Sequence, residues 1–110
     1  ITDTVENIFG SMNNDLIIGD DDVTYSDFLR GSSGNDTIRG LGGADQLFGG
    51  NGNDSLEGGD GADSIFGDGG NDWLYAYLFA NNNDGDIDSL VGGTGTDTLY
   101  GVTGQDVLTQ

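Results

Sequence analysis

The sequence has no cysteine and no histidine, and its only cationic side chains are Arg30 and Arg39. Without cysteine there is no disulfide framework. Without cysteine and histidine, zinc, copper and haem iron lose most of their usual ligands. Histidine, cysteine and lysine supply most general bases and nucleophiles, and all three are absent, so we predict that the chain is not an enzyme.

Apolar residues are also scarce, at 34% of the chain, whereas 22 of the 110 residues are glycine. A chain of this composition buries too little apolar surface to fold without an outside source of stability. Twenty acids give a formal net charge of −18. This charge argues against nucleic-acid partners and against insertion into anionic membranes. Because hard cations prefer oxygen ligands, it favours calcium as the stabilising partner.

No signal peptide or apolar membrane-spanning run is present, and the chain starts at Ile1 instead of methionine. We expect the chain to be processed or excised from a longer protein.

A nine-residue repeat organises the chain. Residues 31–75 read GSSGNDTIR, GLGGADQLF, GGNGNDSLE, GGDGADSIF and GDGGNDWLY, with glycine at places one and four, Asp at place six and Ile or Leu at place eight. The register continues through 1–9, 10–18 and 22–30, and through 83–91, 92–100 and 101–109. It predicts one domain over 1–110 with insertions at 19–21 and 76–82.

The repeat predicts an all-β solenoid. In each unit we expect a turn over the first six places, with glycine at places one and four adopting backbone angles that other residues resist. The last three places alternate with period two, as a strand with one buried face does. Two units turning at opposite ends would close one coil, and stacked coils would form parallel ladders.

The units GGNGNDSLE, GGDGADSIF and GGTGTDTLY resemble the glycine-rich nonapeptide of RTX (repeats-in-toxin) proteins, GGxGxDxUx with U a large aliphatic residue. The resemblance implies a right-handed parallel β-roll of about six coils. It implies several Ca²⁺ ions between turns stacked on the same side, held by turn carbonyls and the sixth-place Asp. It also implies a bacterial protein that is exported by type I secretion and folds outside the cell.

Carried over unit by unit, the resemblance places the aspartates in two stacks, one with Asp15, Asp36, Asp54, Asp72 and Asp97 and the other with Asp27, Asp45, Asp63, Asp88 and Asp106. The matching turn glycines are Gly31, Gly40, Gly49, Gly58, Gly67 and Gly92. The alternative for any one Asp is an Asx-type turn that caps its own backbone. This alternative weighs most at Asp27 and Asp88, whose units lack key glycines.

Two functions are compatible with these observations. The first is a calcium-folded module that supports the secretion and stability of a larger protein. The second is a self-assembling subunit of an extracellular fibre, matrix or surface layer, because neither end of the repeat is capped and open solenoid ends stack. The ninth places of one sheet, Phe9, Arg30, Phe48, Phe66, Val91 and Thr109, would form a partly apolar outer ridge, read either as scattered surface residues or as a lateral interface.

Overall fold

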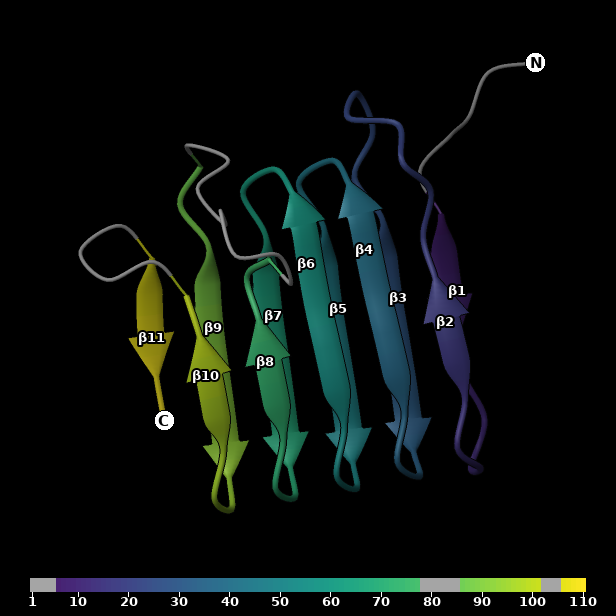
Figure 1. The fold of residues 1–110 in the computed structure, drawn as a ribbon. Helices are drawn as coiled ribbons and strands as arrows, with labels where there is room; N and C mark the ends of the chain where they lie inside the picture. The colour runs from purple at the N-terminus through teal and green to yellow at the C-terminus, as the bar shows by residue number, and fades with distance from the viewer. Residues whose placement is uncertain (1–5, 78–85, 102–105) are drawn as a thin grey trace.

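The computed structural model describes residues 6–77, 86–101 and 106–110, and within them it contains eleven β-strands and no helix. The strands form two parallel sheets that stack as a β-solenoid of about five turns (Figure 1). The six-stranded sheet contains β1 (Asn7–Phe9), β3 (Phe28–Ser33), β5 (Gln46–Asn51), β7 (Ser64–Gly69), β9 (Ser89–Thr94) and β11 (Val107–Thr109). The five-stranded sheet contains β2 (Leu16–Ile18), β4 (Thr37–Gly42), β6 (Ser55–Asp60), β8 (Trp73–Tyr75) and β10 (Thr98–Tyr100).

Successive strands alternate between the sheets, so each strand pairs with the strand two further along the chain. Thr37 pairs with Ser55, eighteen residues on, which is two nonapeptides per coil. Leu16 pairs with Thr37 across the first predicted insertion, and Ser64 pairs with Ser89 across the second. The predicted all-β parallel β-roll is therefore confirmed. Residues 78–82 of the second insertion lie outside the described residues.

The core consists of two facing columns of eighth-place residues, one from each sheet. Its buried members from the repeat are Ile17, Leu29, Ile38, Leu47, Leu56, Ile65, Leu74 and Leu90. Each stacks on the same place of the next coil, as in the pairs Leu29↔Leu47 and Ile38↔Leu56. One aliphatic side chain per nine residues is a thin core, so burial alone leaves the roll marginal.

The strands are longer than the sequence predicts. In β3 to β7 and in β9 the strand covers six residues, places seven to nine and places one to three of the next unit. Pairing continues through Ser32↔Gly50 and Leu41↔Gly59, beyond the alternating side chains. The prediction of a six-residue turn is therefore wrong. The sequence does not reveal the longer strands, because backbone pairing through the glycines requires no side-chain pattern.

The expected role of the first-place glycine is also wrong. Positive φ angles occur at place four, as at Gly52 (φ 127°), and at place two, as at Gly50 (φ 107°), but not at first-place glycines such as Gly49. A Cβ at Gly49 would instead lie 2.7 Å from the carbonyl oxygen of Gly67 and would collide with a carboxylate oxygen of Asp54. Place one needs glycine because the coils and the aspartate pack directly against it.

No helix in the described part of the chain is long and apolar enough to cross a bilayer.

Candidate metal sites

The sixth-place aspartates form two ladders, one at each turn edge of the roll. The amide of each Asp donates to Oδ1 of the Asp one coil further on, as from Asp36 to Asp54 (2.7 Å) and from Asp45 to Asp63 (2.8 Å). One ladder joins Asp15, Asp36, Asp54, Asp72 and Asp97. The other joins Asp27, Asp45, Asp63, Asp88 and Asp106. These are the two groups that the sequence predicts.

The second carboxylate oxygen is different. Oδ2 is buried and has no hydrogen-bond partner in Asp36, Asp45, Asp54, Asp72 and Asp97. A buried carboxylate oxygen without a partner is strongly unfavourable unless a proton or a cation meets it. Burial raises the pKa of Asp45 and Asp54 to about 6 and also raises the pKa of Asp36 and Asp72. The fold therefore holds a row of oxygens that lack a positive partner.

Two predicted ligands lie in a different environment. Oδ2 of Asp15 accepts the amide of Ser11 at 2.6 Å and is also 3.0 Å from the Ser11 hydroxyl. Oδ2 of Asp27 accepts the amide of Asp20 at 3.1 Å. Ser11 belongs to the first N-terminal unit after residue 9 and Asp20 to the insertion at 19–21, so amides that precede each Asp by four and seven residues satisfy these two oxygens. This arrangement is not the Asx-type turn, which uses an amide two residues after the Asp.

The remaining predicted aspartates are members of the second ladder. Asp63 and Asp88 are buried, and Asp106 is half-buried. Oδ1 of Asp88 accepts the Asp63 amide at 2.8 Å, and Oδ1 of Asp106 accepts the Asp88 amide at 3.1 Å. The unit around Asp88 lacks the consensus glycines but keeps its place in the ladder.

The first-place glycines bring backbone oxygens to the same places. A Cβ at Gly40 would lie 2.5 Å from Oδ2 of Asp45 and 2.6 Å from the carbonyl oxygen of Gly58. Gly31, Gly49 and Gly67 lie in the same way against Asp36, Asp54 and Asp72 and against the next glycine carbonyl, and Gly58 and Gly92 lie against Asp63 and Asp97. All six predicted glycines thus lie beside a ladder aspartate.

The two edges differ at the fifth place, which the sequence analysis missed. On the edge of Asp36 and Asp54, each fifth-place Asn accepts the amide of the fifth-place residue of the next coil through Oδ1. This ladder joins Asn14, Asn35, Asn53, Asn71 and Thr96 over 2.8–2.9 Å. On the other edge the fifth place holds the exposed Ala44 and Ala62. The signal was present in the sequence as Asn in every second unit.

The oxygen atoms at the edges are a mixture of single carboxylates and backbone carbonyls, not a carboxylate-rich cage. This mixture fits a hard cation. No group of three or more Asp or Glu side chains that could hold a metal occurs among the described residues. What the edges offer is one carboxylate oxygen per unit together with backbone carbonyls and a glycine surface. Calcium accepts this mixture because it takes six to eight oxygen ligands in flexible geometry, including backbone carbonyls. Magnesium demands a stricter octahedral arrangement.

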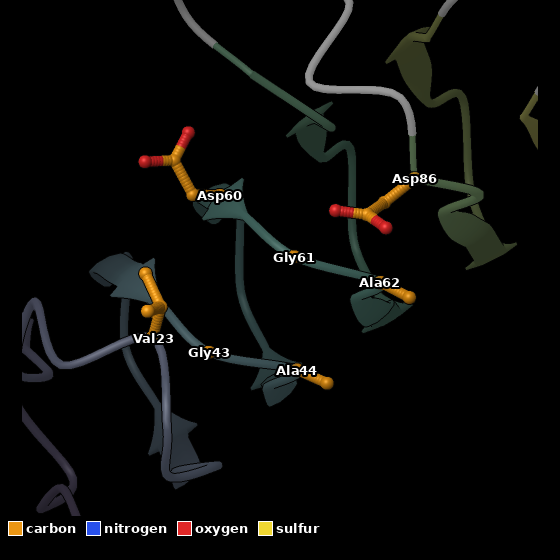
Figure 2. Close-up of a pocket in the computed structure, with 7 residues that line it drawn as sticks. All are labelled: Val23, Gly43, Ala44, Asp60, Gly61, Ala62 and Asp86. Carbon is orange, nitrogen blue, oxygen red and sulfur yellow. The ribbon is translucent and has the colours of Figure 1, made fainter.

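A surface hollow of about 570 Å³ lies on the edge that carries Ala44 and Ala62 (Figure 2). The hollow is lined by equivalent residues of two successive coils on this edge, Gly43 with Ala44 and Gly61 with Ala62. Its other lining residues are Val23, Asp60 and Asp86. Among the residues that the structure describes, the titratable lining residues are Asp60 and Asp86, and both are exposed carboxyls.

The fold and the edges define a class, a parallel β-solenoid whose turns stack carboxylate and carbonyl oxygens in register. A family model for the RTX calcium-binding nonapeptide repeat (4 copies) matches residues 21–56, 48–81 and 83–109. The chain belongs to this family of calcium-binding repeats, which is typical of secreted bacterial proteins. No curated protein and no solved structure matches the chain.

Proposed function

We propose that the chain is a non-enzymatic module that folds when calcium binds between its stacked turns. The Oδ2 atoms of Asp36, Asp45, Asp54, Asp72 and Asp97 and the carbonyls of the adjacent glycines supply the ligands. The observation that carries the proposal is the row of buried, unpartnered Oδ2 atoms in a chain with a net charge of −18. Calcium bound to the folded state alone would remove the repulsion and stabilise the roll by linkage.

The same linkage suits export. Where calcium is scarce, the uncompensated carboxylates and the thin core oppose folding, so the chain stays unfolded during passage through a type I secretion channel. Outside the cell calcium is abundant, and the module folds there and supports the protein that carries it. The family's occurrence in secreted bacterial proteins supports this proposal.

Far-ultraviolet circular dichroism tests the folding step. Without calcium, at neutral pH and low ionic strength, the spectrum should be that of a disordered chain, and millimolar calcium should produce a cooperative change to β structure. Magnesium at the same concentration serves as the control, because it dehydrates reluctantly and suits this donor set poorly. A β spectrum that a chelator leaves unchanged would refute calcium-coupled folding.

A second candidate is a self-assembling subunit that stacks end to end. Within the described residues, the edge strands β1 and β11 each pair with one neighbour, and an edge strand can pair with another chain. Electron microscopy of the calcium-loaded chain tests this candidate. Filaments that grow with protein concentration are expected from head-to-tail stacking, and monodisperse particles at high concentration would argue against it.

A further inference from the structure

The outer face of the six-stranded sheet carries almost no charge in a strongly acidic molecule. On either side of the eighth-place residues, the seventh and ninth places of this sheet are Asn7, Phe9, Phe28, Arg30, Gln46, Phe48, Ser64, Phe66, Ser89, Val91, Val107 and Thr109. None of them is acidic, although the chain has twenty acids. The one acid within the strands of this sheet is the exposed Asp68, at the second place of the unit that follows Phe66, toward the turn edge of Asp54 and Asp72. We name these twelve positions the phenylalanine face.

Four phenylalanines form a continuous stripe on this face across β1, β3, β5 and β7. The ring centroids of Phe9 and Phe28 are 5.8 Å apart, those of Phe28 and Phe48 are 5.1 Å apart, and those of Phe48 and Phe66 are 5.0 Å apart. Phe28 occupies the seventh place of its unit, whereas the other three phenylalanines occupy the ninth place. The ninth place of the Phe28 unit is Arg30. Phe9 is 63% exposed, so the stripe reaches solvent at one end and lies half-buried along the rest.

The opposite face differs in the acids it carries. Its one acid at the seventh and ninth places is Glu57, in an ion pair with Arg39 (3.4 Å). A smaller hollow of about 190 Å³ brings Asp21 and Tyr77, from the connections that follow β2 and β8, beside Glu57. The opposite face also exposes apolar side chains, Trp73 and Tyr100 among them, so the two faces differ in acidic residues and not in apolar character.

We propose that the phenylalanine face binds a second copy of the chain, so that two rolls pack face to face. Two copies with a net charge of −18 repel each other at their acidic turn edges. They can approach without that repulsion where their facing side chains are neutral, and Arg30 is the only charged residue of this face. The absence of acids at these places permits close approach of a second copy, and the stripe of four phenylalanines favours an apolar surface on that copy.

The twelve positions are the centre of a larger contact. A standard interface buries about 800 Å² per partner from about 20–30 residues, so residues that flank the stripe would contribute as a rim. The molecule measures 36 × 34 × 18 Å, which leaves room for such a contact on a broad side. Packing about a twofold axis would bring the two phenylalanine stripes together and close the assembly as a dimer.

Sedimentation velocity with up to about 0.5 mM protein tests the proposal, in a buffer in which circular dichroism shows folded wild-type chain. Wild type should show a monomer–dimer equilibrium. Gln46→Glu places a negative charge on the phenylalanine face and leaves all four phenylalanines in place. Two such charges meet in the dimer, so the dissociation constant should rise about tenfold or more. Phe48→Glu should weaken the dimer further.

Ser55→Glu is the matched control, because it places the same charge at the seventh place of the opposite face and should change the dissociation constant less than about twofold. A wild-type chain that stays monomeric over this range would overturn the proposal. So would equal weakening by Gln46→Glu and Ser55→Glu, or large assemblies that neither substitution affects. The dichroism spectrum of each sample separates loss of the interface from loss of the fold, and its calcium dependence is a separate result.

Discussion

At the scale of single residues, each ladder aspartate uses its two oxygens differently. Oδ1 holds the preceding coil through a backbone amide, and Oδ2 of the central aspartates faces the glycine surface without a protein partner. Under the proposed function, one carboxylate couples the pairing of coils to the binding of a cation. This proposed coupling would let a thin core suffice once calcium is bound.

Asp54→Ala should raise the calcium concentration at the midpoint of folding about tenfold. The change removes one proposed ligand and leaves the buried amide of Asp36 without its acceptor, at a cost of about 1–3 kcal/mol. Asp60→Ala removes the same charge from an exposed position and should shift the midpoint much less. Calcium titrations followed by circular dichroism compare the two. Equal shifts would mean that net charge, and not the ladder site, governs folding.

Leu41→Gly should stabilise the roll. Leu41 has a φ of 77°, in a region where its Cβ is strained, whereas Gly50 and Gly59 occupy the same place of other units. Relief of that strain is worth about 1 kcal/mol, or several degrees in melting temperature for a domain of this size. Leu16→Gly is the control, because Leu16 lies in β2 without positive φ and glycine there should destabilise. A lower melting temperature for Leu41→Gly would contradict the strain argument.

At the scale of elements, the two turn edges are not equivalent. One edge has two ladders that run in opposite directions, because Asn53 accepts from the next coil and Asp54 accepts from the preceding coil. At the fifth place of its central units the other edge has Ala44 and Ala62. The asparagine edge therefore has more cross-coil hydrogen bonds that do not depend on metal.

Asn53→Ala should lower the free energy of unfolding of the calcium-loaded chain by about 1 kcal/mol, because the amide of Asn71 loses its acceptor. Asn51→Ala is the control. Asn51 is exposed, and the bond it accepts from Gly34 uses its backbone carbonyl, which the substitution keeps. Urea unfolding with calcium present measures both variants, and an equal cost at the two positions would show that the asparagine ladder adds nothing specific.

The sequence predicts those features of the strands that depend on repeated side chains, but not those that depend on backbone pairing. The nine-residue register predicts the eighth-place columns, from Ile17 to Leu90. It also predicts that successive units alternate between the two edges. The six-residue strands did not, because the pairing of Ser32 with Gly50 leaves no side-chain pattern. The separate environments of Asp15 and Asp27 depend on Ser11 and Asp20, two residues outside the consensus.

At the scale of the whole molecule, charge is sorted by position. The ladder aspartates occupy the two turn edges, where the cations are proposed to bind, and the seventh and ninth places that form the phenylalanine face have no acid. Composition predicted the total charge and the need for a cation. It could not predict this sorting, because sorting depends on which places of the nonapeptide point outward.

The calcium-free chain should gain folded structure on mild acidification. Burial raises the pKa of Asp45 and Asp54 to about 6 in the folded roll, above the value near 3.9 of an unfolded carboxyl. The folded state then binds more protons between these values, so its stability is greatest below the lower value and is lost as the pH rises through 6. In buffer from which calcium has been removed, the far-ultraviolet circular dichroism signal of β structure should increase as the pH is lowered from 7 to 5. A decrease over that range would contradict the assignment of these carboxylates as the groups that oppose folding.

The central claim is that the unpartnered Oδ2 atoms are calcium ligands. A crystal structure of the chain grown with calcium, with anomalous difference density to place the ions, tests it most directly. The account predicts ions between successive turns, each about 2.4 Å from Oδ2 of a ladder aspartate such as Asp54 or Asp45. Ions bound only to exposed acids such as Asp60 and Asp86, with no ion density next to the ladder Oδ2 atoms, would contradict it.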